Sequence, residues 1–183
     1  MFKRFYPSEY VDSVFLIDYE KLYNKGYRGL IFDIDNTLVH HGDDSTEKVD
    51  SLFKSIQMLG FKTLLLSNNN EERVKRFNKN IGSLYICDAE KPKTKNYIKS
   101  IEMLNLKRNE VLVIGDQVFT DILGANRSKM DSILVKFIRQ ENETNIGKRR
   151  KIENVILSFY SKNKLAYNKI GDITKKEVKE NVV

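Results

Sequence analysis

The chain has 183 residues, a formal net charge of +7 and 40% hydrophobic residues. This length allows one domain with a substantial core, and the composition is that of a globular chain rather than a disordered one. No apolar stretch approaches the roughly 18 residues that a membrane span requires. The first residues contain no apolar segment typical of a secretory signal, so a cytoplasmic location is expected.

The N-terminal segment carries hydrophobic residues at mainly helical spacing between residues 9 and 25. We therefore expect residues 1–27 to form a helical extension that packs on the core. Three aromatic residues near the start, Phe2, Phe5 and Tyr6, are interleaved with two basic residues. This arrangement fits either packing against a sheet or an anchor at a membrane interface.

The first expected strand ends in two carboxylates, Asp33 and Asp35, which are one residue apart. Alternate residues of a strand point to the same side. Open α/β sheets bind their ligands at the carboxyl ends of the strands. Clustered carboxylates need a cation or a shared proton between them, and oxygen ligands suit Mg²⁺. The alternative for such a pair alone is a strand that ends in a solvated turn.

Helical patterns and short apolar runs alternate over the rest of residues 28–140. The predicted elements are helices at about 46–59, 70–80 and 94–104, a short helix after Asp116, and strands at 61–66, 84–87, 111–114 and 132–135. This alternation predicts a parallel α/β sheet with helices on both faces.

Polar residues follow the ends of the later strands as well. Ser67 and Asn68 follow the second apolar run, Lys91 follows the third, and Asp116 and Asp121 follow the fourth. A parallel sheet brings the carboxyl ends of its strands to one edge, so these side chains are expected to meet.

Four motifs in this order resemble those of the haloacid dehalogenase (HAD) superfamily of phosphohydrolases, over roughly residues 28–138. They are Asp33-x-Asp35-x-Thr37-Leu38, Ser67-Asn68, Lys91 and Gly115-Asp116-x-x-x-Asp121. At finer grain, residues 5–11, 67–74 and 115–121 resemble the small YqeG-type, subfamily IIIA phosphatases, a group that includes phosphatidylglycerophosphate phosphatases. The resemblance implies a single HAD-like Rossmannoid domain over residues 28–140 and Mg²⁺-dependent hydrolysis of phosphomonoesters.

The resemblance also implies catalytic roles. Asp33 would be the nucleophile and form an aspartyl-phosphate. Asp35 would act as general acid and base, which requires a pKa raised toward neutrality, for example by burial. Mg²⁺ would be held by the Asp33 carboxylate, the main-chain carbonyl of Asp35 and Asp116.

The remaining motif residues would bind the phosphoryl group or orient the groups around it. Ser67 and Asn68 would bind the transferring phosphoryl group, and Lys91 would offset its charge, with Lys93 or Lys95 as alternatives. Asp121 would orient Lys91 or a metal-bound water, and Thr37 would support the loop geometry. The alternative for Asp121 is an ordinary helix-surface position.

The spacing between the motifs leaves no room for a large cap domain. By resemblance, capless HAD enzymes suit a phosphate that is presented on something bulky, and phosphatidylglycerophosphate is the substrate that we expect. The alternatives are a soluble nucleotide, sugar phosphate or phosphoprotein, or a non-catalytic RNA or assembly factor. The sequence leaves substrate identity and oligomeric state open.

The basic character of the chain belongs to its C-terminal end. Residues 148–183 contain ten Lys or Arg and four Asp or Glu, while the rest is almost neutral. We expect residues 141–183 to be a basic, partly helical extension, with apolar residues that fit a docking helix at Val155, Ile156, Phe159 and Leu165. It fits peripheral contact with an anionic membrane at its inner face, or a solvated tail; nucleic acid is the less favoured partner.

Overall fold

The computed structural model describes residues 3–139, 148–162 and 170–175. Within these residues, six strands form one sheet in the order β1-β6-β5-β2-β3-β4, and every pair is parallel. The strands are β1 (Glu9–Val11), β2 (Gly29–Phe32), β3 (Lys62–Leu66), β4 (Leu84–Ile86), β5 (Val111–Gly115) and β6 (Asp131–Val135). The predicted α/β class is confirmed, and all carboxyl ends lie at one edge.

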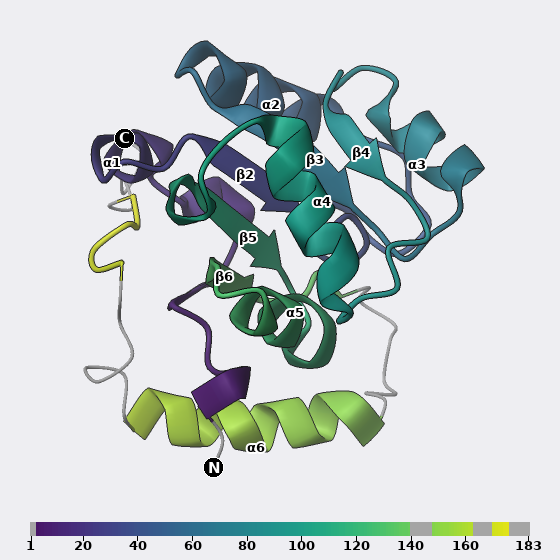
Figure 1. The fold of residues 1–183 in the computed structure, drawn as a ribbon. Coiled ribbons are helices and arrows are strands. Elements are labelled where there is room, and N and C mark those ends of the chain that lie inside the picture. The colour runs from purple at the N-terminus through teal and green to yellow at the C-terminus, as the bar shows by residue number, and fades with distance from the viewer. Residues whose placement is uncertain (1–2, 140–147, 163–169, 176–183) are drawn as a thin grey trace, which may run out of the picture.

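Helices cover both faces of the sheet (Figure 1). Leu30 and Phe32 of β2 belong to a core cluster with residues of α1 (Tyr19–Asn24), α2 (Glu47–Met58) and α3 (Glu71–Asn78). Ile31 belongs to a second cluster, with residues of α4 (Thr94–Leu104) and α5 (Leu123–Arg127). Neighbouring residues of a strand point to opposite faces, so a strand buried on both faces must be apolar throughout, as β2 is.

The predicted helices at 46–59, 70–80 and 94–104 correspond to α2, α3 and α4. The Thr46 side chain accepts a hydrogen bond from the Val49 N–H at the start of α2. Asn70 does the same for the Arg73 N–H at the start of α3. Such caps satisfy N–H groups that lack a partner within the helix, which explains why these helices begin where they do.

The prediction of helix from residue 9 is wrong at its start. Glu9–Val11 is strand β1, in which Glu9 lies opposite Ile133 of β6. The 3₁₀ turn η2 (Val14–Leu16) and α1 follow, and the Ser13 and Asp18 side chains cap them. A three-residue strand is too short to show an alternating pattern, and its pairing with a distant strand decides its conformation.

Tyr6 packs against α6 (Lys148–Lys162), which lies beside the N-terminal segment in Figure 1. Tyr6 belongs to a third core cluster with Ile156 and Tyr160 of α6. The Phe5 ring meets the Phe119 ring edge-on, with centroids 5.4 Å apart. Tyr6 is therefore a core residue, and Phe5 is a partly buried one that packs against the same cluster. Phe2 and Leu165, for which packing or docking was also expected, lie outside the described residues.

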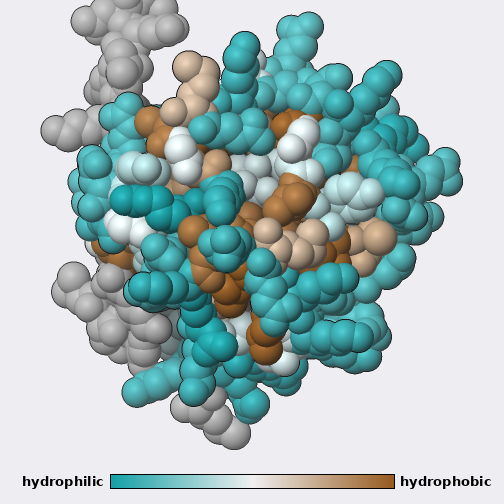
Figure 2. Space-filling model, turned by 45° about the horizontal axis from the view of Figure 1, so that its top comes forward, coloured by the Kyte–Doolittle hydropathy of each residue, from teal (hydrophilic) through white to brown (hydrophobic). Residues whose placement is uncertain are grey.

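In the described part of the chain, the structure contains no helix whose length and apolar character would let it cross a bilayer. Figure 2 shows one face of the molecule, on which hydrophobic residues gather in a limited area near the middle and hydrophilic residues surround them.

The remaining short elements are the 3₁₀ turns η1 (Lys3–Phe5) and η3 (Arg108–Glu110) and the π-helical turn η4 (Val118–Ile122).

Candidate active site

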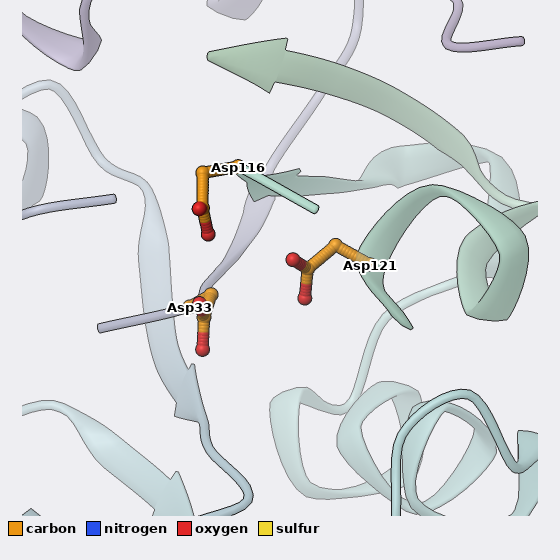
Figure 3. Close-up of side chains that lie close together, drawn as sticks. All are labelled: Asp33, Asp116 and Asp121. Carbon is orange, nitrogen blue, oxygen red and sulfur yellow. The ribbon is translucent and has the colours of Figure 1, made fainter. Parts of the chain in front are cut away.

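Three carboxylates meet at the carboxyl edge of the sheet. Asp33 directly follows β2, Asp116 follows β5, and Asp121 lies in η4. Their side chains point toward one another in Figure 3, and one oxygen of each lies within 4.8 Å of the others. A Cβ on Gly115 would collide with the Asp121 side chain, so glycine allows this approach.

Lys91 lies between two of these carboxylates. Its Nζ is 2.6 Å from Asp33 Oδ1 and 2.7 Å from Asp121 Oδ1, and all three side chains are buried. Lys93 instead pairs with Glu90 at the surface. The structure therefore brings Lys91, and not Lys93, to the carboxylates, and it places Asp121 in the interior rather than on a helix surface.

The loop after β3 is tied to the loop that carries Lys91. The Asn68 side-chain oxygen accepts the main-chain N–H of Lys91 at 2.8 Å. The Ser67 hydroxyl accepts hydrogen bonds from the main-chain N–H and the side-chain amide of Asn69, at 3.2 and 3.1 Å. Ser67, Asn68, Lys91 and Asp33 line one cavity of about 150 Å³. These two loops and the first motif thus enclose one small polar cavity.

Thr37 holds two of the clustered carboxylates. Its hydroxyl lies 3.1 Å from Asp116 Oδ1 and 3.4 Å from Asp33 Oδ2. Because one hydroxyl hydrogen serves one acceptor at a time, the shorter contact, to Asp116, is the main one. Thr37 thereby fixes the orientation of Asp116 as well as the loop that it belongs to.

Asp35 lines the same cavity, but its carboxylate is bound to other partners. One oxygen accepts from the Gly42 N–H at 2.9 Å and from Arg73 at 3.0 Å, and the other from the Asn69 amide. Burial alone would raise the Asp35 pKa, but these three donors together hold that pKa below its usual range. The expected rise of its pKa toward neutrality is therefore wrong for this arrangement.

The pKa values of Asp33 and Asp116, in contrast, are raised above the usual value. Burial raises the pKa of Asp33 to about 7, against the opposing effect of Lys91, and the neighbouring carboxylates add to the rise. Burial likewise raises the pKa of Asp116 to about 6, against the effect of Arg150. Without a further cation, the cluster therefore holds protons close to neutral pH.

These shifts predict how stability depends on pH. The unfolded chain releases the same protons near pH 3.9, so the folded, metal-free protein binds more protons between about pH 4 and pH 7. Its free energy of unfolding should therefore fall as pH rises through this window. A divalent cation binds the deprotonated carboxylates, so Mg²⁺ should raise the thermal midpoint more at about pH 8 than at about pH 5.5. Thermal unfolding in EDTA and in Mg²⁺ measures this, and an equal rise at both pH values would contradict it.

The cluster fits a hard divalent cation, because Asp33, Asp116 and Asp121 offer only carboxylate oxygens that lie close together. Both oxygens of Asp121 already accept hydrogen bonds, from Lys91 and from the Gln117 N–H, so Asp33 and Asp116 are the two carboxylates better placed to bind an ion. The Asp35 carboxylate is not part of this cluster. A larger cavity of about 610 Å³, lined in part by Tyr19, Met58 and Lys175, contains none of the three. The smaller cavity is therefore the candidate active site.

Two arginines that lie outside the four motifs also belong to this region. Arg73 of α3 binds Asp35, as described above, and Arg150 of α6 binds Asp116. In the sequence, Arg150 is only one member of a basic run. Arg150 lies three residues before Glu153, and Glu153 lies three residues before the buried Ile156, so each pair lies on neighbouring positions of the helix surface. This spacing is the pattern that could have singled Arg150 out.

Comparison with known proteins agrees with this geometry. Residues 41–129 match the family model described as haloacid dehalogenase-like hydrolase. "Probable phosphatase YqeG" of Bacillus subtilis (strain 168) is 37% identical over 160 residues, which cover 86% of this chain and 93% of that protein. The chain belongs to the haloacid dehalogenase-like hydrolase family. Within it, the chain is an enzyme of the YqeG type, a phosphatase.

Solved structures share the fold. An uncharacterized protein from Listeria monocytogenes serotype 4b superposes with a TM-score of 0.53 at 16% identity, covering 73% of this chain and 99% of that chain. The cobalt-bound deoxy-D-mannose-octulosonate 8-phosphate phosphatase of Haemophilus influenzae gives 0.48 at 17% identity, covering 79% and 94%. The Listeria structure supports the single α/β domain.

Proposed function

We propose that this phosphatase hydrolyses a phosphomonoester carried by a lipid, such as phosphatidylglycerophosphate, with Mg²⁺ as cofactor. The observation that carries the proposal is an apolar groove that lies next to the catalytic cavity and is lined in part by α6. A polar cavity beside an apolar groove matches a substrate with a phosphate at one end and an apolar body behind it.

Asp33 is proposed as the nucleophile. Its carboxylate oxygen forms a bond to phosphorus while the bond from phosphorus to the leaving alcohol breaks, which gives an aspartyl-phosphate. The leaving oxygen takes a proton from the Asp35 carboxyl. A water molecule then attacks the phosphorus, gives its proton back to Asp35 and releases phosphate from Asp33. For the first transfer, the hydrogen bonds from Arg73 and Asn69 to Asp35 must loosen, because they favour its charged form.

The other residues bind and offset charge. Ser67 and Asn68 are proposed to bind the transferring phosphoryl oxygens, and the Lys91 ammonium to offset their charge. Asp33, Asp116 and the main-chain carbonyl of Asp35 would hold Mg²⁺, which supplies positive charge against the phosphoryl group when it is bound. Asp121 orients Lys91 through their 2.7 Å contact.

The apolar groove has a volume of about 380 Å³ and is lined by Pro92, Phe119 and Ile152, with Arg149 at its side. Lys91 and Thr120 line both this groove and the catalytic cavity, so the two are neighbours. A lipid phosphomonoester with a second phosphate in its headgroup would meet both the Arg149 charge and the apolar lining.

The outer face of α6 continues this apolar lining. Ile152, Val155 and Phe159 are 54%, 56% and 45% exposed and follow one another at helical spacing. Lys148, Arg149 and Lys151 lie at the start of the same helix. Apolar residues bordered by basic ones suit the surface of an anionic membrane, and this supports peripheral contact of α6 with the leaflet that presents the substrate.

Phosphate release tests the proposal directly. We would compare phosphatidylglycerophosphate in mixed micelles with a panel of soluble phosphomonoesters, each with Mg²⁺ and with EDTA. Mg²⁺-dependent release from the lipid, well above the soluble panel, is the expected result. Activity on soluble esters alone would keep the chemistry and reject the lipid.

A charge placed on the apolar groove should separate the two substrate classes. Ile152→Asp should lower kcat/KM for the micellar lipid about tenfold, because it removes apolar contact and adds repulsion from anionic headgroups. Activity on a small soluble ester should change little. Ile98→Asp is the matched control, since Ile98 is an exposed isoleucine of α4 (39% exposed). Equal losses on both substrates would argue against the groove.

A further inference from the structure

The C-terminal helix reaches into the cluster of carboxylates. Arg150 of α6 donates a hydrogen bond to the main-chain oxygen of Asp116 at 2.7 Å and a second one to its Oδ2. The Arg150 side chain is only 19% exposed, and that of Asp116 is fully buried. A planar guanidinium that binds two atoms of one residue fixes that residue's orientation, which a single ammonium cannot do.

Glu153 holds Arg150 in this position. One oxygen of the Glu153 carboxylate lies 3.0 Å from Arg150 Nη1. The other accepts the main-chain N–H groups of Val118 and Phe119, at 2.9 and 3.3 Å, where η4 begins. Glu153 is buried as well, so its charge needs these partners. One turn of α6 thus contacts both Asp116 and the turn that carries Asp121.

We propose that Arg150 is a positioning residue for the divalent metal site: it fixes the Asp116 carboxylate so that this carboxylate can serve as a ligand, and Glu153 fixes Arg150. The catalytic unit then includes α6, outside the 41–129 segment that the family model matches. The inference rests on the metal site of the proposed function, and it concerns a residue that none of the four motifs contains.

The charges favour positioning over competition with the metal. An arginine alone beside Asp116 would repel a divalent cation, but the negative charge of Glu153 lies 3.0 Å from the guanidinium and largely balances it. The Asp116 oxygen that faces Thr37 accepts from a neutral hydroxyl, which leaves it able to bind an ion. With Thr37 on one oxygen and Arg150 on the other, the Asp116 carboxylate has one defined orientation.

Mg²⁺ binding to the full chain, followed by isothermal titration calorimetry, tests this inference without any substrate. Arg150→Ala should weaken Mg²⁺ binding about tenfold or more, as is usual when a residue that orients a metal ligand is removed. Arg150→Lys keeps the charge but loses the guanidinium that binds two Asp116 oxygens at once. Its affinity for Mg²⁺ should therefore lie between those of Arg150→Ala and the wild type. Lys151→Ala is the matched control on the exposed side of α6 and should bind like the wild type.

The outcomes are distinct. Equal or tighter Mg²⁺ binding by a folded Arg150→Ala protein would overturn the inference while leaving the metal site in place. If Arg150→Ala does not fold, Arg150→Lys decides alone: wild-type affinity would overturn the inference, and weaker binding with a wild-type circular dichroism spectrum would support it. Absence of Mg²⁺ binding by the wild type would overturn both the metal site and the inference, even if phosphatase activity remained.

Discussion

Asp33→Asn should abolish turnover, with a fall in kcat of at least about 10³-fold. The amide cannot form the bond to phosphorus that the carboxylate forms, and it removes one proposed metal ligand. The same substitution should raise the thermal midpoint of the metal-free protein at about pH 8. Burial and two neighbouring carboxylates oppose the charge of Asp33 there, as its raised pKa of about 7 indicates.

The measurement is phosphate release together with thermal unfolding in EDTA. Loss of activity with retained or increased stability separates a chemical role from a structural one, because a merely structural residue would lower both. Asp12→Asn is the control, since Asp12 is an exposed carboxylate on the loop after β1, and it should alter neither quantity. An Asp33→Asn protein that retains wild-type turnover would refute the proposed nucleophile.

Much of the fold follows from patterns within short stretches of sequence. α2 and α4 bury one face at helical spacing, and β2 is apolar throughout because both of its faces are covered. Strand β1 could not be predicted in this way. Its three residues carry no period of their own, and β6, which lies far along the chain, determines their conformation.

The candidate site could likewise be predicted only in part. The strand ends predict that Asp33, Ser67, Lys91 and Asp116 meet, because parallel topology alone brings them to one edge. The Asp35 environment could not be predicted, since it depends on where the Arg73 side chain and the Gly42 N–H come to lie. Burial predicts a raised pKa for such a carboxylate, and only the positions of its donors reverse that sign.

The contact of Arg150 with Asp116 could not be predicted for a different reason. In the sequence this arginine belongs to a basic run that is read as one surface feature, whereas the helix turns each member toward a different environment. Arg149 lines the groove, Arg150 binds Asp116, and Lys151 is exposed. Net charge identifies the segment as a candidate for anionic partners, but only helix phase assigns each charge its partner.

Lys91→Met should cost both activity and stability. Its ammonium lies 2.6 Å from Asp33 and 2.7 Å from Asp121 in the interior, and removal of one partner from a buried ion pair typically costs about 3–5 kcal/mol. Loss of a charge that faces the transferring phosphoryl group should also lower kcat about 10²- to 10³-fold. Denaturant unfolding and phosphate release, each with Mg²⁺ and with EDTA, measure the two effects.

Mg²⁺ should restore part of the stability that Lys91→Met loses, because a divalent cation can neutralise the carboxylates that the ammonium leaves behind. It should not restore the turnover, since Lys91 also lines the cavity in which the phosphate is proposed to bind. Lys93→Met is the matched control: Lys93 pairs with Glu90 at the surface, where an ion pair contributes little. If Lys93→Met removed activity and Lys91→Met did not, the position of Lys91 between the carboxylates would be structural, and the phosphoryl charge would have to be offset from elsewhere.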